Sequence, residues 1–241
     1  DYVSWTFRKA PKFFDVVTYT GTDVARDIPH NLGVEPGMII VKSSSLALGW
    51  SVYHINTGGT KYLKLEDSSA PFTTSGIWND TNATDSVFTL GTGTRVNGAN
   101  GEYVAYLFAH DESDESMIKC GSFTDLENSG ASSQHIELGF EPQFILMKTA
   151  SRESAWYMWD TMRGMREPQS KFLLANDSVV ESYINSPFAI YPTPTGFYMP
   201  GFWGAGEDVI YMAIRRSNKK AEEFEPEELF AVGGYTGSGA E

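Results

Sequence analysis

An internal repeat constrains the fold of this 241-residue sequence more than any other feature. The segment LGVEPGMIIVK at residues 32–42 recurs as LGFEPQFILMK at 138–148, at an offset of 106 residues. The same offset relates WSVYH at 50–54 to WYMWD at 156–160. Self-similarity at a fixed period indicates one structural unit used more than once, so the two halves should share a fold.

Two shorter matches continue the repeat in the same order. Lys64-Leu65 aligns with Leu173-Leu174 at an offset of 109, and GEYVAY aligns with GEDVIY at an offset of 105. At the ends, YVSWTF at 2–7 resembles YVAYLF at 103–108, and YTG at 235–237 resembles YTG at 19–21. In chain order we predict the last strand of a preceding unit at 1–12, a first unit at 13–110, an acidic linker at 111–119, a second unit at 120–215, a charged linker at 216–229 and the start of a further unit at 230–241.

Hydrophobic and polar residues alternate within each unit. In YLKL at 62–65 the leucines fall on one face of a strand, and the tyrosine and lysine fall on the other. Residues 38–41 are a continuous apolar run, typical of a strand covered on both faces. Trp50 and Trp156 keep their identity across the repeat, so we expect both to face a core. Turn sequences such as NTGG at 56–59 separate the runs.

This pattern predicts an all-β fold of two tandem antiparallel β-sandwich units, of jelly-roll or lectin-like type, each of about 100 residues. The 23 glycines and 11 prolines are spread along the chain, as expected for many short strands joined by turns.

The charge balance restricts the partners. Asp and Glu number 31 against 18 Lys and Arg, which gives a net charge of -13. Such a surface repels phosphate backbones and anionic headgroups, so we expect neither nucleic-acid binding nor membrane insertion. No apolar run approaches the roughly 20 residues that span a bilayer. The single cysteine, Cys120, excludes an internal disulfide and a Cys-rich zinc site.

Motifs for catalysis are missing from the sequence. There is no GxSxG elbow, no HExxH and no phosphate-binding glycine loop. The histidines His30, His54, His110 and His135 lie far apart, and Asp160 replaces His54 in the second unit. We therefore expect no enzyme, no cofactor and no metal site.

Cysteine and carboxylate chemistry gives little support for an enzyme. Cys120 follows an acidic run that should raise the pKa of its thiol, so we expect an unreactive strand residue facing the core. A polysaccharide depolymerase would need two carboxylates about 5 to 10 Å apart. Candidate pairs are Glu35 with Glu141, Asp80 with Asp85, and Glu102 with Glu207. A surface role already explains each of these positions, so the enzyme is the less favoured alternative.

Loop aromatics supply the candidate binding residues. Trp78 comes directly before the polar residues Asn79 and Asp80, and Trp203 lies in a glycine-rich loop. A tryptophan beside Asn and Asp can stack on a sugar ring and hydrogen-bond to its hydroxyls. We therefore predict that Trp78, Asn79, Asp80 and Trp203 contact a glycan or a neighbouring subunit. The alternative is that these aromatics cap the ends of the sandwiches.

Three segments carry a resemblance to a known class of domain. They are YVSWTFRKAPKFFDVVTYTG at 2–21, HNLG followed by PGMIIVK within 30–42, and YVAYLFA at 103–109. They resemble a repeated β-rich domain of virion structural proteins of tailed bacteriophages, in particular marine phages and cyanophages. The resemblance covers nearly the whole chain and implies a tail-fibre or appendage component. It carries over no catalytic or binding residue.

The expected function is therefore that of a structural virion module, with a spacing, assembly or host-adhesion role and a location on the phage tail or a surface appendage. Expected partners are further copies of the chain, with a trimer favoured, other virion proteins and host surface polysaccharide. Two alternatives stay open. One is a capsid decoration protein, and the other is a lectin-like module that binds host surface glycan.

Overall fold

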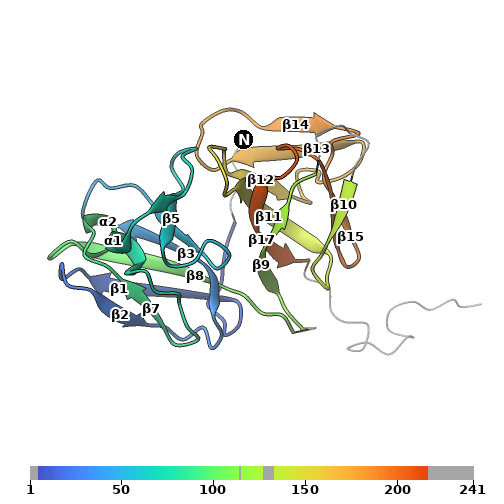
Figure 1. Cartoon of the computed structure of the whole chain (residues 1–241). Coiled ribbons are helices and arrows are strands. Elements are labelled where there is room, and N and C mark those ends of the chain that lie inside the picture. Colours follow the sequence, from blue (N-terminus) through green and yellow to red (C-terminus); the bar gives the residue numbers. More distant parts are fainter. Residues whose placement is uncertain (1–4, 114, 127–132, 217–241) are drawn as a thin grey trace, which may run out of the picture.

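The computed structural model describes residues 5–113, 115–126 and 133–216, which form two β-rich units side by side (Figure 1). The first unit has a six-stranded antiparallel sheet in the order β1-β8-β3-β4-β5-β6. These strands are β1 (Phe14–Thr20), β3 (Pro36–Ser43), β4 (Ser51–His54), β5 (Lys61–Lys64), β6 (Phe72–Thr73) and β8 (Glu102–Ala109). A small second layer packs on this sheet and consists of β2 (Arg26–Pro29), β7 (Val87–Leu90) and the one-turn helices α1 (Ser75–Trp78) and α2 (Thr94–Asn97).

The second unit repeats this arrangement. Its main sheet has the order β14-β13-β12-β11-β17-β9, and β10, β16 and β15 form a three-stranded sheet beside it. The strands are β9 (Ile118–Thr124), β10 (Ser133–Glu137), β11 (Pro142–Thr149), β12 (Tyr157–Asp160), β13 (Gln169–Leu174), β14 (Ser182–Asn185), β15 (Tyr191–Thr193), β16 (Gly196–Pro200) and β17 (Asp208–Arg215). Each strand of one main sheet has a counterpart at the same place in the other. The all-β, sandwich-type fold is therefore confirmed, and the common strand order is what a duplication requires.

Strand pairing reproduces the offset of 106 in the centre of the sheets. Met38 pairs with His54, and Phe144 pairs with Asp160. Both sheets also have an irregularity directly after a proline, at Pro36 and at Pro142. Proline has no N–H to donate to the ladder, so the repeated Glu-Pro sequence places the same bulge in both units.

Two of the predicted alignments are wrong by one residue. Ser51 pairs with Lys64 and Tyr157 pairs with Leu174, which makes the offset 110 rather than 109. On β8 and β17 the pairing restores the offset of 106 in place of 105. A shift of one residue turns every side chain of a strand to the opposite face of the sheet. The alignment of the two repeats is therefore determined by the backbone pairing and not by the similarity of residue types.

Strand β11 separates two hydrophobic cores. Ile145 and Met147 point into the core of the second unit, together with Trp159. Phe144 and Leu146 alternate with them and belong to the core of the first unit. The two main sheets therefore pack against each other, and one apolar core continues from the first unit into the second. This explains why the run on each central strand is apolar on both faces.

Polar contacts fix the joint between the units. His54 Nε2 lies 3.0 Å from the carbonyl oxygen of Tyr211, and Ser154 N donates to the carbonyl oxygen of Ser68 at 2.9 Å. The ammonium of Lys148 donates to the same Ser68 oxygen at 3.1 Å. Polar side-chain and main-chain groups of one unit thus find their hydrogen-bond partners in the other unit where the sheets meet.

The beginning of the chain differs from the prediction of a final strand of a preceding unit. In its described part, residues 5–9 form no strand. Instead the ring of Trp5 lies 5.7 Å from that of Phe144, and the ring of Phe7 lies 5.3 Å from that of Phe14. One ring thus packs on each unit, so this segment contacts both.

The predicted linkers are only partly described. Strand β9 begins at Ile118, so the last two residues of the acidic linker at 111–119 belong to the second sheet. The charged linker at 216–229, beyond Arg216, and the predicted further unit at 230–241 lie outside the described residues.

Candidate functional site

Trp78, which was predicted to contact a glycan or a neighbouring subunit, is a core residue of the first unit. Thr74 caps helix α1 by accepting a hydrogen bond from Gly76 N. The single helical turn points Ile77 and Trp78 inward, and the Trp78 side chain is only 1% exposed. Its ring lies 5.9 Å from that of Tyr53 in an edge-on contact. Burial in a packed core leaves no face of the indole free for a sugar.

Asn79 and Asp80 are exposed and end this helix. Both have positive φ, at 53° and 52°. Asn79 N donates to the carbonyl oxygen of Ser75, which closes the turn. Asn and Asp adopt this left-handed conformation more readily than other residues with side chains, so the turn itself accounts for the two residue types.

Trp203 is half-buried and belongs to the other core. Its ring makes edge-on contacts with Tyr157 at 5.7 Å and with Phe202 at 4.8 Å, and its Nε1 donates to Ser154 Oγ at 3.1 Å. Asp125 Oδ2 accepts backbone N–H bonds from residues 202–204, which fixes the loop. Trp78 and Trp203 therefore pack on separate hydrophobic cores and do not form one site.

The two buried histidines are held by main-chain groups. His54 accepts a bond from Asn56 N at Nδ1, so its proton is on Nε2, which donates to Tyr211. His30 repeats this arrangement with Leu32 N and the carbonyl oxygen of Thr84. Burial lowers the pKa of His54 to about 4 and also lowers the pKa of His30, so both rings are neutral at neutral pH.

Cys120 lies on β9 and is completely buried, as predicted. A Cβ added at Gly37 would come within 2.5 Å of its Cβ, so β9 approaches the bulge of β3 closely. Burial raises the pKa of the thiol, which suppresses its nucleophilicity.

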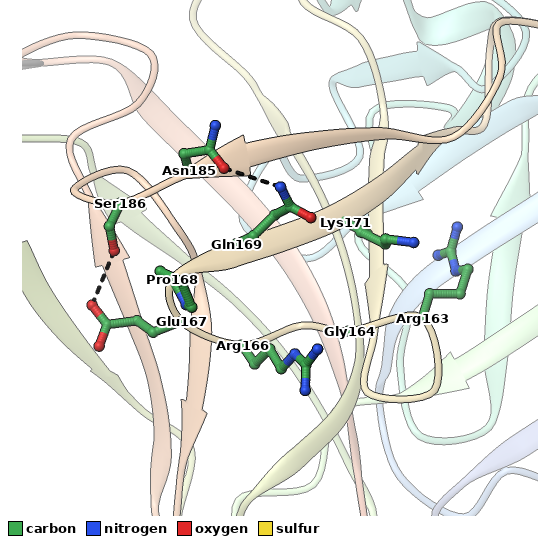
Figure 2. Close-up of a pocket in the computed structure, with 9 residues that line it drawn as sticks. All are labelled: Arg163, Gly164, Arg166, Glu167, Pro168, Gln169, Lys171, Asn185 and Ser186. Atoms are coloured by element: carbon green, nitrogen blue, oxygen red, sulfur yellow. Dashed lines mark hydrogen bonds between the residues drawn. The ribbon is translucent and has the colours of Figure 1, made fainter.

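A hollow of about 640 Å³, lined mostly by charged and polar residues, opens in the second unit between the β12–β13 loop, β13 and the end of β14 (Figure 2). Its lining residues are Arg163, Gly164, Arg166, Glu167, Pro168, Gln169, Lys171, Asn185 and Ser186. None of them was among the predicted site residues.

A lengthened loop builds this hollow. Residues 55–60 join β4 to β5, whereas the longer stretch 161–168 joins β12 to β13. The register offset rises from 106 to 110 across this loop. The change of offset between the sequence matches was therefore the signal of an insertion at this place. The insertion brings the basic residues Arg163 and Arg166, which have no basic counterpart in NTGG of the first unit.

The replacement of His54 by Asp160 anchors the loop. Arg163 Nε lies 2.7 Å from Asp160 Oδ2, and Arg163 N donates to Oδ1 at 2.8 Å. Nη2 donates to the carbonyl oxygen of Met158 at 3.2 Å. The two charged side chains are only 11% and 8% exposed, and the guanidinium lies 5.4 Å from the ring centre of Trp5. Nη1 is buried and has no hydrogen-bond partner among the described residues.

The lining of the hollow carries charges of both signs. Arg163, Arg166 and Lys171 lie beside the carboxylate of Glu167, and the carboxylate of Asp160 already pairs with Arg163. Lys171 pairs with Glu181 at 3.0 Å on one side, whereas Arg166 is exposed and has no ion pair or hydrogen bond to any described residue. Figure 2 shows Gln169 and Lys171 extending from β13 and Arg166 from the preceding loop.

Neutral polar groups complete the lining. Gln169 Nε2 donates to Asn185 Oδ1 at 3.1 Å, and Ser186 Oγ donates to Glu167 Oε1 at 3.3 Å. Guanidinium, amide and hydroxyl groups at one concave surface can bind an anionic, hydroxyl-rich molecule.

Within 5–113, 115–126 and 133–216, no group of three or more His, Cys, Asp or Glu side chains is placed to hold a metal ion. No helix in the described part of the chain is long and apolar enough to cross a membrane.

The fold and the hollow define an all-β protein of two duplicated sandwich units, with a basic polar hollow in the second. The chain belongs to the family described as a domain of unknown function, DUF7483, whose model matches residues 7–214. No curated protein matches the chain.

Two viral proteins are among the solved structures to which the chain is similar. One is the STIV MCP, with 7% identity and a TM-score of 0.27 over 84% of this chain and 95% of that chain. The other is the major capsid protein P2 from Bacteriophage PM2, with 10% identity and a TM-score of 0.25 over 85% of this chain and 99% of that chain. TM-scores this low carry no argument about fold or function.

Proposed function

We propose that the protein is a structural module of a tailed-bacteriophage virion, in a tail fibre or appendage, and that it is not an enzyme. The observation that supports this best is the joint between the units. Two duplicated sheets pack on each other through one continuous core and are cross-linked by hydrogen bonds such as that from His54 to Tyr211. A joint of this kind keeps two units at a fixed angle, as a spacer or anchor needs.

The resemblance of residues 2–21, 30–42 and 103–109 to phage virion domains supports the same class. The groups that could do chemistry have structural roles instead. Both ring nitrogens of His30 and His54 are bonded to main chain, and Cys120 is buried.

Assembly with further copies or with other virion proteins is part of this proposal. β14 is the outer strand of its sheet, and among the described residues one side of it has no neighbouring strand. Val180, just before it, is 86% exposed, and Tyr183 on it is 56% exposed. An unpaired strand edge beside exposed apolar side chains is a common place for another chain to add. A homotrimer is the favoured assembly.

Localisation on purified particles tests this function. Immunogold labelling and quantitative mass spectrometry of virions should place the chain on the tail or an appendage, at a copy number that matches the tail symmetry. A copy number that matches the capsid lattice would favour the decoration protein instead. Absence from the particle would overturn the proposal.

A lectin-like module that contributes to host adhesion is the second candidate. The basic hollow of the second unit favours it, because concave polar surfaces of this size bind small ligands.

A further inference from the structure

We propose that the hollow between the β12–β13 loop and β14 binds an anionic group of an acidic saccharide, with Arg166 as its main ligand. This inference rests on the second candidate function, the lectin-like module, and names its ligand class, whereas it does not depend on the structural role.

The hollow is not needed for the fold. The first unit has the same strand order with a shorter loop in this place, so the architecture forms without it. The second unit has an insertion that carries Arg163 and Arg166 and the replacement of His54 by Asp160. The longer loop and its buried ion pair are therefore additions to the architecture that the two units share.

The electrostatic contrast favours an anion. The chain as a whole has a net charge of -13, yet the lining of this hollow holds three cations and one carboxylate. Asp160 pairs with Arg163 and Glu181 pairs with Lys171, so Arg166 is the cation of the lining that has no ion pair to a described residue. An exposed guanidinium at a concave surface attracts anions locally.

The arginines are arranged for different tasks. Asp160 holds the guanidinium of Arg163 by its Nε and so positions the loop. Arg166 is exposed and has no partner of its own among the described residues, so its planar fork is free for a carboxylate or sulfate. Lys171 adds a second positive charge from β13, and its ammonium group also forms an ion pair with Glu181.

The remaining lining suits a sugar better than an acidic peptide. The volume of about 640 Å³ lies in the range of small-molecule sites. Gln169 and Asn185 bond to each other and keep further amide donors and acceptors for hydroxyl groups, and Ser186 adds a hydroxyl. The lining has no large apolar side chain, which the anchor residue of a peptide would require.

Calorimetric titration of the full chain tests the proposal with four probes. These are a galacturonic acid trisaccharide, a sulfated disaccharide, a neutral galactose trisaccharide and inorganic sulfate. We expect one or both acidic saccharides to bind. Comparing the affinities of the galacturonic acid trisaccharide and the sulfated disaccharide shows whether the site prefers a carboxylate or a sulfate. The neutral sugar and sulfate alone should bind at least about tenfold more weakly, because charge and hydroxyl contacts are both needed.

Two variants with the same change of charge locate the site. Arg166→Gln should weaken binding of the acidic saccharide by about tenfold, as expected for loss of one charge-assisted contact. Arg8→Gln changes an exposed arginine elsewhere and should leave binding within about twofold. Thermal unfolding checks that both variants fold as the unchanged protein does.

Several outcomes would overturn the proposal. They are no binding of either acidic saccharide up to about 10 mM, equal losses in the two variants, or equal binding of inorganic sulfate. Tight binding of a synthetic peptide with the sequence of residues 221–229 at the same hollow would assign it to a contact between copies instead. None of these results would change where the chain lies on the particle.

Discussion

The indole Nε1 of Trp156 in the second unit donates a hydrogen bond of 2.8 Å to the carbonyl oxygen of Lys64 in the first. Trp156 is 1% exposed, whereas its repeat counterpart Trp50 is only half-buried. The local geometry is the same in both, since Asn176 accepts a bond from Trp156 N and Glu66 accepts one from Trp50 N. Equivalent tryptophans of the repeat therefore differ in role. Trp156 lies between the two units, whereas Trp50 lies near the surface.

Truncation of the two tryptophans should therefore have unequal effects. Trp156→Ala should lower the free energy of unfolding by about 3 to 5 kcal/mol, because it leaves a cavity in the shared core. Trp50→Ala should cost only about 1 to 2 kcal/mol, since part of the ring is already solvated. Urea denaturation followed by circular dichroism measures both values. Equal losses would contradict the assignment of Trp156 to the joint.

Acidification should weaken the fold before the carboxylates titrate. His54 has a folded-state pKa of about 4 and an ordinary value of 6.5. The unfolded chain therefore takes up a proton first as the pH falls, so stability is complete above pH 6.5 and decreases down to pH 4. The loss from this group is on the order of 3 kcal/mol.

Urea midpoints between pH 7 and pH 4 test this dependence. His54→Gln should flatten the profile, although His30 adds a smaller slope of the same sign. A profile of unchanged slope in His54→Gln would disprove this role of the histidine.

The ion pair of Asp160 and Arg163 should show strong coupling. Asp160→Asn leaves a buried guanidinium without its counter-charge and should cost about 3 kcal/mol, as should Arg163→Met for the carboxylate. The double variant should cost less than the sum of the single ones, because no unpaired charge remains. A double-mutant cycle from urea denaturation gives the coupling energy, and additive losses would contradict the pairing seen in the loop.

Trypsin provides a local readout of the same loop. In the unchanged protein the anchored Arg163 should resist cleavage, whereas Asp160→Asn should accelerate cleavage at Arg163 and Arg166. Mass spectrometry of the first fragments identifies the cleaved bond. A variant with unaltered cleavage would show that the loop is held by other contacts.

The rings of Trp5 and Phe7 should stabilise both units. Replacing Trp5 by Ala removes its contact with Phe144 and should cost about 2 kcal/mol. Replacing the exposed Arg8 by Ala should cost less than about 0.5 kcal/mol. Thermal unfolding of the two variants compares these losses of stability. If Trp5→Ala lost less stability than Arg8→Ala, the Trp5 ring would be exposed to solvent and not packed on Phe144.

The thiol of Cys120 should report on opening of the joint. A thiol reagent such as Ellman's reagent should react in urea but only very slowly in the native protein, because the side chain is buried and its pKa is raised. Trp156→Ala should speed the native reaction by lowering the cost of opening. Rapid labelling of the unchanged protein would contradict the burial of β9 against β3.

Much of the architecture could be predicted from local sequence. Alternation of side chains identifies strands because their direction has a period of two along the backbone. The Glu-Pro blocks at 35–36 and 141–142 predicted equivalent strands, since a proline acts on its own backbone and needs no distant partner. Cys120 was also predicted to be a strand residue that faces the core, and it is completely buried on β9.

The candidate site could not be found in this way. Trp78 precedes a polar turn in the sequence, but one helical turn capped by Thr74 points it inward. The hollow was missed because its lining comes from two strands and a loop that adjoin only after β13 pairs with β14. The one available signal in the sequence was the change of repeat offset after residue 160, together with the basic residues Arg163 and Arg166 that follow it.

The sequence by itself determined that this protein is a duplicated all-β chain, because strand periodicity and repeated turns are properties of neighbouring residues. Only the tertiary structure decided that the two units share a core, that Trp156 rather than Trp50 lies in the joint, and that Asp160 holds Arg163 beside a basic hollow. These features depend on which sheet faces meet, and the free energy of that contact is summed over residues far apart in the chain.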